Sequence, residues 1–238
     1  MESFSEFLQR VDSFEVPTLG MDIDNFVPSD SVRQKVGEDN RFCPFYGDTV
    51  VFDLPDSAKR FVCDIAYTLR SVAPECFCEK LNESTFHMTL HDLSNSPDES
   101  MISEQMGQNG YNIEQKFSIN PIYKQEITMK ANYIINMVNT SIVLTLKPAD
   151  EEEYNKLIEL YQFFDDIQRL PYPFTPHITL AYYNRYGFLR NSGEVLKKVV
   201  EDYNNCVPGT IITLNTAQLF YQRFDNMNDF CTIFRITG

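Results

Sequence analysis

Hydrophobic and polar residues alternate in a clear order from residue 49 onward. Residues 49–54 form a short apolar run typical of a strand, and Pro55 follows at a position suited to the first turn of a helix. Apolar residues then recur with the 3.6-residue helical period, namely Ala58, Phe61, Val62, Ile65, Ala66, Leu69 and Val72. Pro74 ends this helix, and residues 86–91 have the pattern of a second strand. This segment therefore predicts a strand, a helix and a strand.

The same order of patterns occurs a second time. Residues 142–147 alternate as a strand does, and Pro148 precedes the acidic run 150–153, which suits the first turn of a helix. The apolar face of this helix consists of Tyr154, Leu157, Ile158, Tyr161 and Phe164. After the loop 171–174, residues 176–180 again read as a strand. A repeat of whole units predicts two similar lobes that face each other.

The remaining segments fit around these two units. Residues 127–138 alternate and are expected to form a hairpin with the strand that follows, and residues 95–116 are expected to be a long connection with some helix. Residues 192–203 predict a helix, and residues 211–221 and 230–236 predict a closing pair of strands.

The N-terminal part is different. Residues 3–14 predict a short amphipathic helix, and residues 17–44 show no clear period. We expect residues 1–46 to form an extension that packs on the main domain.

Composition and charge restrict the function classes. With 43% hydrophobic residues and a formal net charge of -14, the chain can build a core but shows no basic cluster, so long nucleic acid is not an expected partner. A small anionic ligand held by local hydrogen-bond donors is compatible with this charge.

Cellular location is predicted from the cysteines and from the absence of a targeting pattern. The six cysteines contain no CxxC pair and are expected to be free thiols in a reducing cytosol. The N-terminus has no signal-peptide pattern, and no apolar run approaches about 20 residues. We therefore expect a cytoplasmic monomer with no membrane segment.

A His-x-Thr-Leu sequence occurs in each of the two repeated units. Because residues i and i+2 of a strand point to the same face, His87 projects with Thr89 and His177 with Thr179. If the two strands meet, two imidazoles and two hydroxyls line one cleft. One imidazole can take a proton from water and the other can give one to a leaving oxygen, while the hydroxyls hold a phosphate. This set predicts phosphodiester hydrolysis with no metal or cofactor.

A zinc site is the main chemical alternative for the histidines. His87 and His91 are four residues apart on a predicted strand, which spans about 13 Å, so they cannot easily share an ion. His91 is expected on the cleft face but has no counterpart in the second unit, where Ala181 stands. A structural role is therefore favoured for His91.

At these motifs the sequence resembles the 2H phosphoesterase superfamily, which includes ligase-T-like and RNA cyclic phosphodiesterases. The resemblance rests on His87-Met88-Thr89-Leu90 and His177-Ile178-Thr179-Leu180 and covers roughly residues 47–238. It implies an α+β fold of two pseudo-symmetric antiparallel-sheet lobes, roughly 47–124 with the C-terminal return strands and 125–238, with helices outside and a central cleft.

The resemblance also implies an activity. It implies metal-independent cleavage of a 2′,3′-cyclic phosphate, a 2′–5′ linkage or a cyclic oligonucleotide, with His177 activating water and His87 protonating the leaving oxygen. The substrate favoured is a nucleotide or short oligonucleotide. Candidate stacking groups for a base are Tyr46, Phe174, Tyr182 and Tyr183.

Two other function classes remain open. The chain could be a sensor that binds a nucleotide phosphate without turnover, or an acidic partner-binding protein. Two intact histidine motifs favour the enzyme over the sensor, and acidity alone gives no reason for the repeated His-x-Thr.

Overall fold

Eight strands form one curled antiparallel sheet in the computed structural model, which describes residues 2–14 and 21–236. The strands are β1 (Tyr46–Asp53), β2 (His87–Ser96), β3 (Glu126–Met137), β4 (Ser141–Pro148), β5 (His177–Tyr182), β6 (Ile211–Asn215), β7 (Leu219–Asn226) and β8 (Asp229–Arg235). Their order across the sheet is β6-β3-β4-β5-β2-β1-β7-β8. β2 and β5, the two central strands, are those that carry the His-x-Thr motifs.

Six α-helices accompany the strands in the described ranges. They are α1 (Phe4–Asp12), α2 (Asp30–Lys35), α3 (Asp56–Val72), α4 (Ser103–Ile119), α5 (Glu151–Asp165) and α6 (Arg190–Asn204). The predicted repeat is confirmed and extends by one helix, since β1-α3-β2-α4 and β4-α5-β5-α6 follow the same order. The result is an α+β fold of two matching halves that share one sheet.

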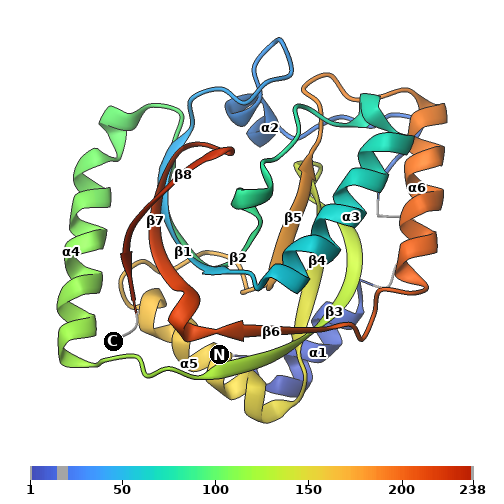
Figure 1. Cartoon of the computed structure of the whole chain (residues 1–238). Coiled ribbons are helices and arrows are strands. Elements are labelled where there is room, and N and C mark those ends of the chain that lie inside the picture. Colours follow the sequence, from blue (N-terminus) through green and yellow to red (C-terminus); the bar gives the residue numbers. More distant parts are fainter. Residues whose placement is uncertain (1, 15–20, 237–238) are drawn as a thin grey trace.

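The helices lie outside the curled sheet, as Figure 1 shows. α3 and α6 lie side by side over one half, and α4 stands alone against the other. No helix of the described segments is long and apolar enough to cross a membrane.

Local sequence explains where the two repeated helices begin. Pro55 is the N-cap of α3, and Ala58, Val62 and Leu69 are among the residues that α3 buries. At α5 the side chain of Asp150 accepts a hydrogen bond from the Glu153 backbone amide, and three acidic residues occupy the first turn.

The segment 95–116 is more ordered than the sequence predicts. β2 continues to Ser96, and α4 is a full helix. The buried face of α4 includes Asn109 and Gly110, so it lacks the apolar period by which helices are recognised. A Cβ at Gly110 would lie 3.2 Å from the Tyr221 ring, which shows how closely α4 approaches β7.

The predicted strand 211–221 is wrong as a single element. It is interrupted by a 3₁₀ turn over Thr216–Gln218, where the Asn215 side chain accepts from the Ala217 backbone amide. Because of this break, β6 pairs with β3 and β7 pairs with β1, in opposite halves of the sheet.

The N-terminal extension packs against the second half of the sheet. Phe7 and Val11 of α1 are buried with Tyr154 of α5. The backbone carbonyl of Val11 accepts a hydrogen bond from the side-chain amide of Asn132. Val32 of α2 is buried separately. Residues 15–20, which include the start of the stretch 17–44 predicted to be irregular, lie outside the described residues.

The buried carboxylate of Asp48 joins α4 to three strands. It accepts hydrogen bonds from the Ser94 amide (2.7 Å), the Asn109 side chain (3.0 Å) and the Tyr221 hydroxyl (2.8 Å). Burial raises the pKa of Asp48, and these donors oppose the rise.

We expect Asp48→Ala to lower the free energy of unfolding by about 3 kcal/mol, because it leaves several buried donors without an acceptor. The urea midpoint, at unchanged slope, measures the loss. Asp48→Asn is the matched control: it keeps one acceptor oxygen and is expected to lose less. Equal losses in both variants would contradict the role of the acceptors.

Candidate active site

The two histidine motifs meet where the two halves of the sheet join. β2 and β5 are antiparallel and are bridged at a single pair, Met88 with Ile178, whose side chains are fully buried. This register sets His87 across from Thr179 and Thr89 across from His177. The sheet thus brings the four predicted side chains together on the face opposite the Met88 and Ile178 side chains.

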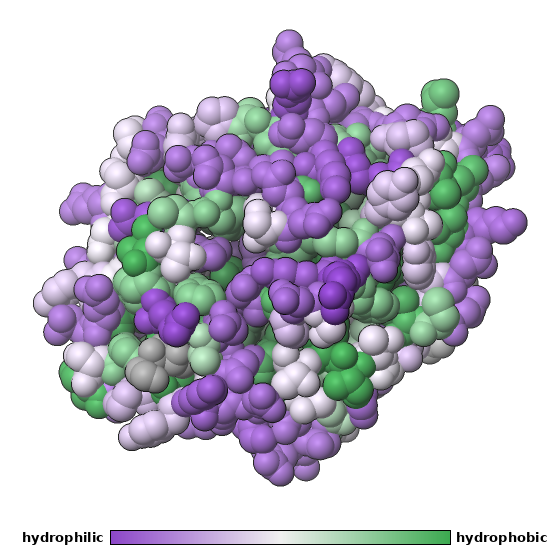
Figure 2. All heavy atoms as spheres, in the orientation of Figure 1, coloured by the Kyte–Doolittle hydropathy of each residue, from purple (hydrophilic) through white to green (hydrophobic). Residues whose placement is uncertain are grey.

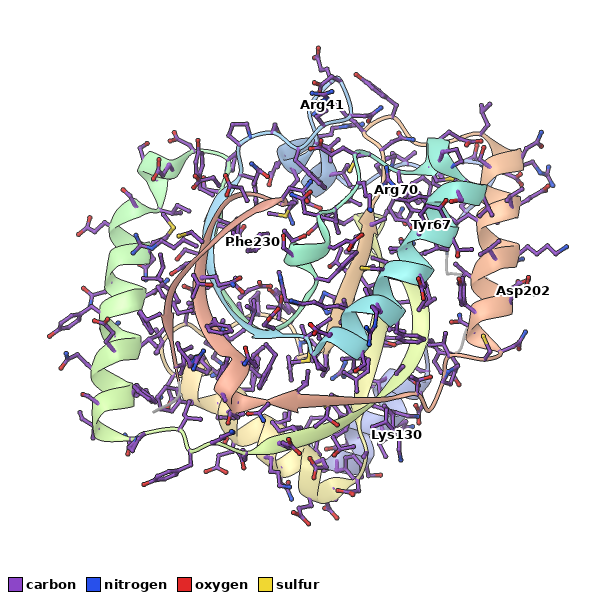
Figure 3. The ribbon with its side chains drawn as sticks, in the orientation of Figure 1. Arg41, Tyr67, Arg70, Lys130, Asp202 and Phe230 are labelled. Carbon is purple, nitrogen blue, oxygen red and sulfur yellow. The ribbon has the colours of Figure 1, made fainter. Side chains whose placement is uncertain are left out.

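These four side chains line one large cavity. Its volume is about 800 Å³, and all four are half-buried in its wall. The remaining wall is rich in aromatic rings, including Phe230 of β8, labelled in Figure 3, whose ring centroid lies 5.1 Å from that of His87. On the face of the molecule seen in Figure 2, hydrophilic residues predominate, with hydrophobic patches between them.

Both central strands carry an irregularity directly after the motif. The pairing of β2 with β1 skips Leu90, and the pairing of β5 with β4 skips Leu180. An extra residue reverses the alternation of side chains beyond it. For this reason Asp92 and Tyr182, each five residues after its histidine, line the cavity.

The same irregularity corrects the prediction that His91 shares the cleft face. His91 is only 1% exposed, is not among the cavity residues, and stacks near Tyr161 with ring centroids 4.9 Å apart. Its Nε2 lies 3.6 Å from the Asp165 carboxylate, and burial lowers its pKa. His91 is a structural residue behind the wall.

Each motif histidine is oriented by the carbonyl two residues before it. Nδ1 of His177 lies 2.7 Å from the Thr175 carbonyl oxygen, and the His87 ring is hydrogen-bonded to the Thr85 backbone. A carbonyl only accepts, so Nδ1 of His177 carries the hydrogen. Nε2 of His177 is therefore the nitrogen left for chemistry.

The protonation state of His87 follows from its surroundings. Burial lowers the pKa of His87 to about 4, and the charge of His177 acts in the same direction, while the Asp92 carboxylate opposes it. In the ligand-free cavity His87 is neutral near pH 7.

The stacking candidates separate into two pairs. Tyr182 and Phe174 line the cavity. Tyr183, the residue after β5, does not: it is fully buried, and its ring centroid lies 4.8 Å from that of Phe26. Tyr46 is half-buried at the far end of β1 and is also outside the cavity wall.

Three residues beside the two motifs, Thr85, Thr175 and Asp92, escaped the sequence reasoning. Two pairs of residues occupy matching positions around the two motifs, namely Thr85 with Thr175 and Asp92 with Tyr182. Extending the repeat in both directions would therefore have found these three residues. Lys35 also lines the cavity, and no pattern in the sequence singles it out.

Six cysteines are free thiols, as predicted. Burial raises the pKa of Cys76 and of Cys78 to about 12, so neither is a thiolate near neutral pH. Within residues 2–14 and 21–236, no group of three or more His, Cys, Asp or Glu side chains is placed to hold a metal ion.

Comparisons with known proteins complete the description. No protein-family model and no curated protein sequence matches this chain. Among solved structures, ATU0111 of Agrobacterium tumefaciens, described as a conserved protein of unknown function, matches with a TM-score of 0.65 at 15% identity, over 90% of this chain and 97% of that one.

Two weaker matches are E. coli LigT complexed with 3′-AMP and TT0787 of Thermus thermophilus. LigT matches with a TM-score of 0.46 at 14% identity, over 80% of this chain and 97% of the LigT chain. TT0787 matches with a TM-score of 0.47 at 12% identity, over 81% of this chain and 98% of the TT0787 chain. At such identities, likeness extends to the fold and no further. The chain therefore has the two-lobed α+β fold expected of a 2H phosphoesterase, and it shares its overall architecture with ATU0111.

Proposed function

We propose that this protein is a phosphodiesterase that hydrolyses a 2′,3′-cyclic phosphate, a 2′–5′ linkage or a cyclic oligonucleotide by paired-histidine acid–base catalysis. One observation carries the proposal: the Met88–Ile178 register places His87, Thr89, His177 and Thr179 together on the wall of one cavity. Two imidazoles and two hydroxyls on the wall of one cavity are the groups that in-line displacement at phosphorus needs.

The reaction needs two proton transfers, and each imidazole can carry out one of them. A water oxygen attacks phosphorus and loses its proton to one imidazole, while the other imidazole gives its proton to the departing ester oxygen. The hydroxyls of Thr89 and Thr179 donate to the non-bridging oxygens. Since one proton is taken and one is given, no further acid, base or metal is required.

The surroundings of His87 favour it as the base. A neutral ring can accept the water proton at once, whereas an acid role would require the bound phosphate to raise its pKa from about 4. We therefore propose that His87 takes the proton and that Nε2 of His177 gives one. This is the reverse of the order implied by the family resemblance.

A small ligand suits the cavity. A volume of about 800 Å³ is within the usual range for small-molecule sites, and the rings of Tyr182 and Phe174 offer faces on which a base can stack. We propose a nucleotide or short oligonucleotide as substrate.

The proposal is tested by turnover of a substrate panel in the presence of a chelator. The panel contains 2′,3′-cyclic nucleotides, 2′–5′ and 3′–5′ dinucleotides and cyclic dinucleotides. We expect hydrolysis of at least one, at an unchanged rate with EDTA. Tight binding of a panel member without hydrolysis would favour the sensor, and neither binding nor hydrolysis of any would reject the proposal.

The pH dependence of kcat/KM tests whether His87 takes part in the reaction, and the pKa of the leaving group distinguishes the two proton orders. If His87 is the base, protonation below its pKa stops the reaction, so kcat/KM should hold down to about pH 5 and halve near pH 4. Either order gives this limb, because exchanging the proton between the two rings leaves the pH profile unchanged. A p-nitrophenolate leaving group needs no acid, so on a p-nitrophenyl phosphodiester His177→Ala should lose less activity than His87→Ala, and the opposite ranking would reverse the proposed order.

Asp92 is the control for this assignment, since it is the carboxylate that raises the pKa of His87 from within the cavity. In Asp92→Asn the acid limb should move to lower pH and persist. Loss of the limb in that variant would assign the limb to Asp92 and not to His87.

A further inference from the structure

Lys35 is a cation of the cavity wall that comes from outside the repeated units. It is the last residue of α2, in the N-terminal extension. Its ammonium lies over two rings, 5.0 Å from the centroid of Phe45 and 5.5 Å from that of Tyr182. In the part of the chain that the structure describes, no carboxylate lies within 4 Å of it.

Arg10, which also lines the cavity, provides a contrast. Its guanidinium makes two hydrogen bonds to the Glu2 carboxylate (2.8 and 2.9 Å) and two more to Thr175 and to the Phe174 carbonyl. Arg10 is thus already neutralised and has its donors in use. Lys35 has three N–H donors, and among the described residues the contacts of its ammonium are with the faces of two aromatic rings.

Leaving an ammonium in such a place is unfavourable for the empty protein. Burial lowers the pKa of Lys35, and the Asp92 carboxylate only partly opposes this. An anion that entered the cavity would remove the penalty by accepting the hydrogen bonds of the ammonium.

The position of Lys35 relative to the motifs indicates which anion. Tyr182, on which the ammonium rests, has a side-chain hydrogen bond with Thr179. The Tyr182 side chain therefore lies between the Lys35 ammonium and the Thr179 hydroxyl, which would hold the reacting phosphate. The reacting phosphate already has donors from both motifs, so the ammonium is placed for a neighbouring group.

We propose that Lys35 binds a second phosphate of the substrate, so that the preferred substrate is a nucleotide or short oligonucleotide with at least two phosphate groups. This inference rests on the proposed function for the place of the first phosphate. It gives the N-terminal extension a part in substrate selection, because α2 supplies the group that recognises the second phosphate.

The test compares two ligands that differ by one phosphate, adenosine 3′-monophosphate and adenosine 3′,5′-bisphosphate. Calorimetry measures their affinities for the full chain, for Lys35→Met, which keeps the stem over the rings, and for Lys124→Met, which removes an exposed charge outside the cavity. We expect the bisphosphate to bind at least about tenfold more tightly, as one charge-assisted contact allows.

In Lys35→Met this preference should fall to about twofold or less, with the monophosphate unaffected, and Lys124→Met should behave as the unmodified chain. Equal affinities for the two ligands in the unmodified chain, or equal losses for both in Lys35→Met, would overturn the inference. Lys35→Arg should restore part of the preference. Turnover of the panel reports separately on the proposed function, so hydrolysis that persists while the bisphosphate preference is missing would refute only the role of Lys35.

Discussion

His87→Ala and His177→Ala should each lower kcat/KM on the best panel substrate by about 10²–10⁴-fold, because each removes one of the two proton-transfer groups. The register of β2 and β5 places both rings on the same cavity wall, so loss of one ring leaves the other without the second proton-transfer group. Initial rates under kcat/KM conditions measure the effect.

Two comparisons sharpen this result. The double variant should be little slower than the worse single variant, since groups that act as a unit give non-additive losses. His91→Gln, at the one histidine outside the wall, should retain kcat/KM within about threefold even if it lowers stability. Full activity in both alanine variants would refute paired-histidine catalysis.

Replacing Thr89 or Thr179 by Val should lower kcat by about 10²-fold, the usual cost of removing one donor to a developing oxyanion. Valine keeps the branched shape of threonine and replaces the hydroxyl by a methyl group. The near two-fold relation of the motifs predicts losses of similar size at the two positions. Steady-state kinetics separates this effect on kcat from a change in KM.

Serine variants serve as the matched control for the threonines. Thr89→Ser and Thr179→Ser keep the hydroxyl and lose one methyl group, so they should remain within about tenfold of the unmodified chain. A serine variant as slow as its valine counterpart would show that packing, and not hydrogen bonding to phosphate, is the function of that residue.

Much of the fold could be predicted because both units bury a single apolar face. α3 and the β3–β4 hairpin agree closely with the sequence pattern. The prediction failed where polar residues are buried, as at Asn109 of α4, or where one side chain ends a strand, as at Asn215. A hydrophobic period indicates which apolar residues are buried. It detects neither a buried polar residue nor a side chain that ends a strand.

The candidate site was predictable only as far as strands are regular. His87, Thr89, His177 and Thr179 were found from the i, i+2 rule and lie together in the cavity. Beyond them the extra residues Leu90 and Leu180 reverse that rule, which is why His91 was expected on the wrong face and why the candidate Tyr183 lies outside the cavity wall. The position of Lys35 depends on how the extension packs, a long-range contact that no local pattern encodes.

The matching of the two halves has a consequence for how a diester lies in the cavity. A perfectly two-fold arrangement of His and Thr would bind the diester equally well in either of two directions, and would not distinguish the leaving oxygen from the ester oxygen that stays. Direction must come from positions where the halves differ. Asp92 and Tyr182 are such a pair, with a carboxylate and a phenol at equivalent places of the cavity wall, and the Lys35 ammonium lies over the ring of the phenol. The direction of the proposed reaction is therefore set by the residues at which the two halves differ.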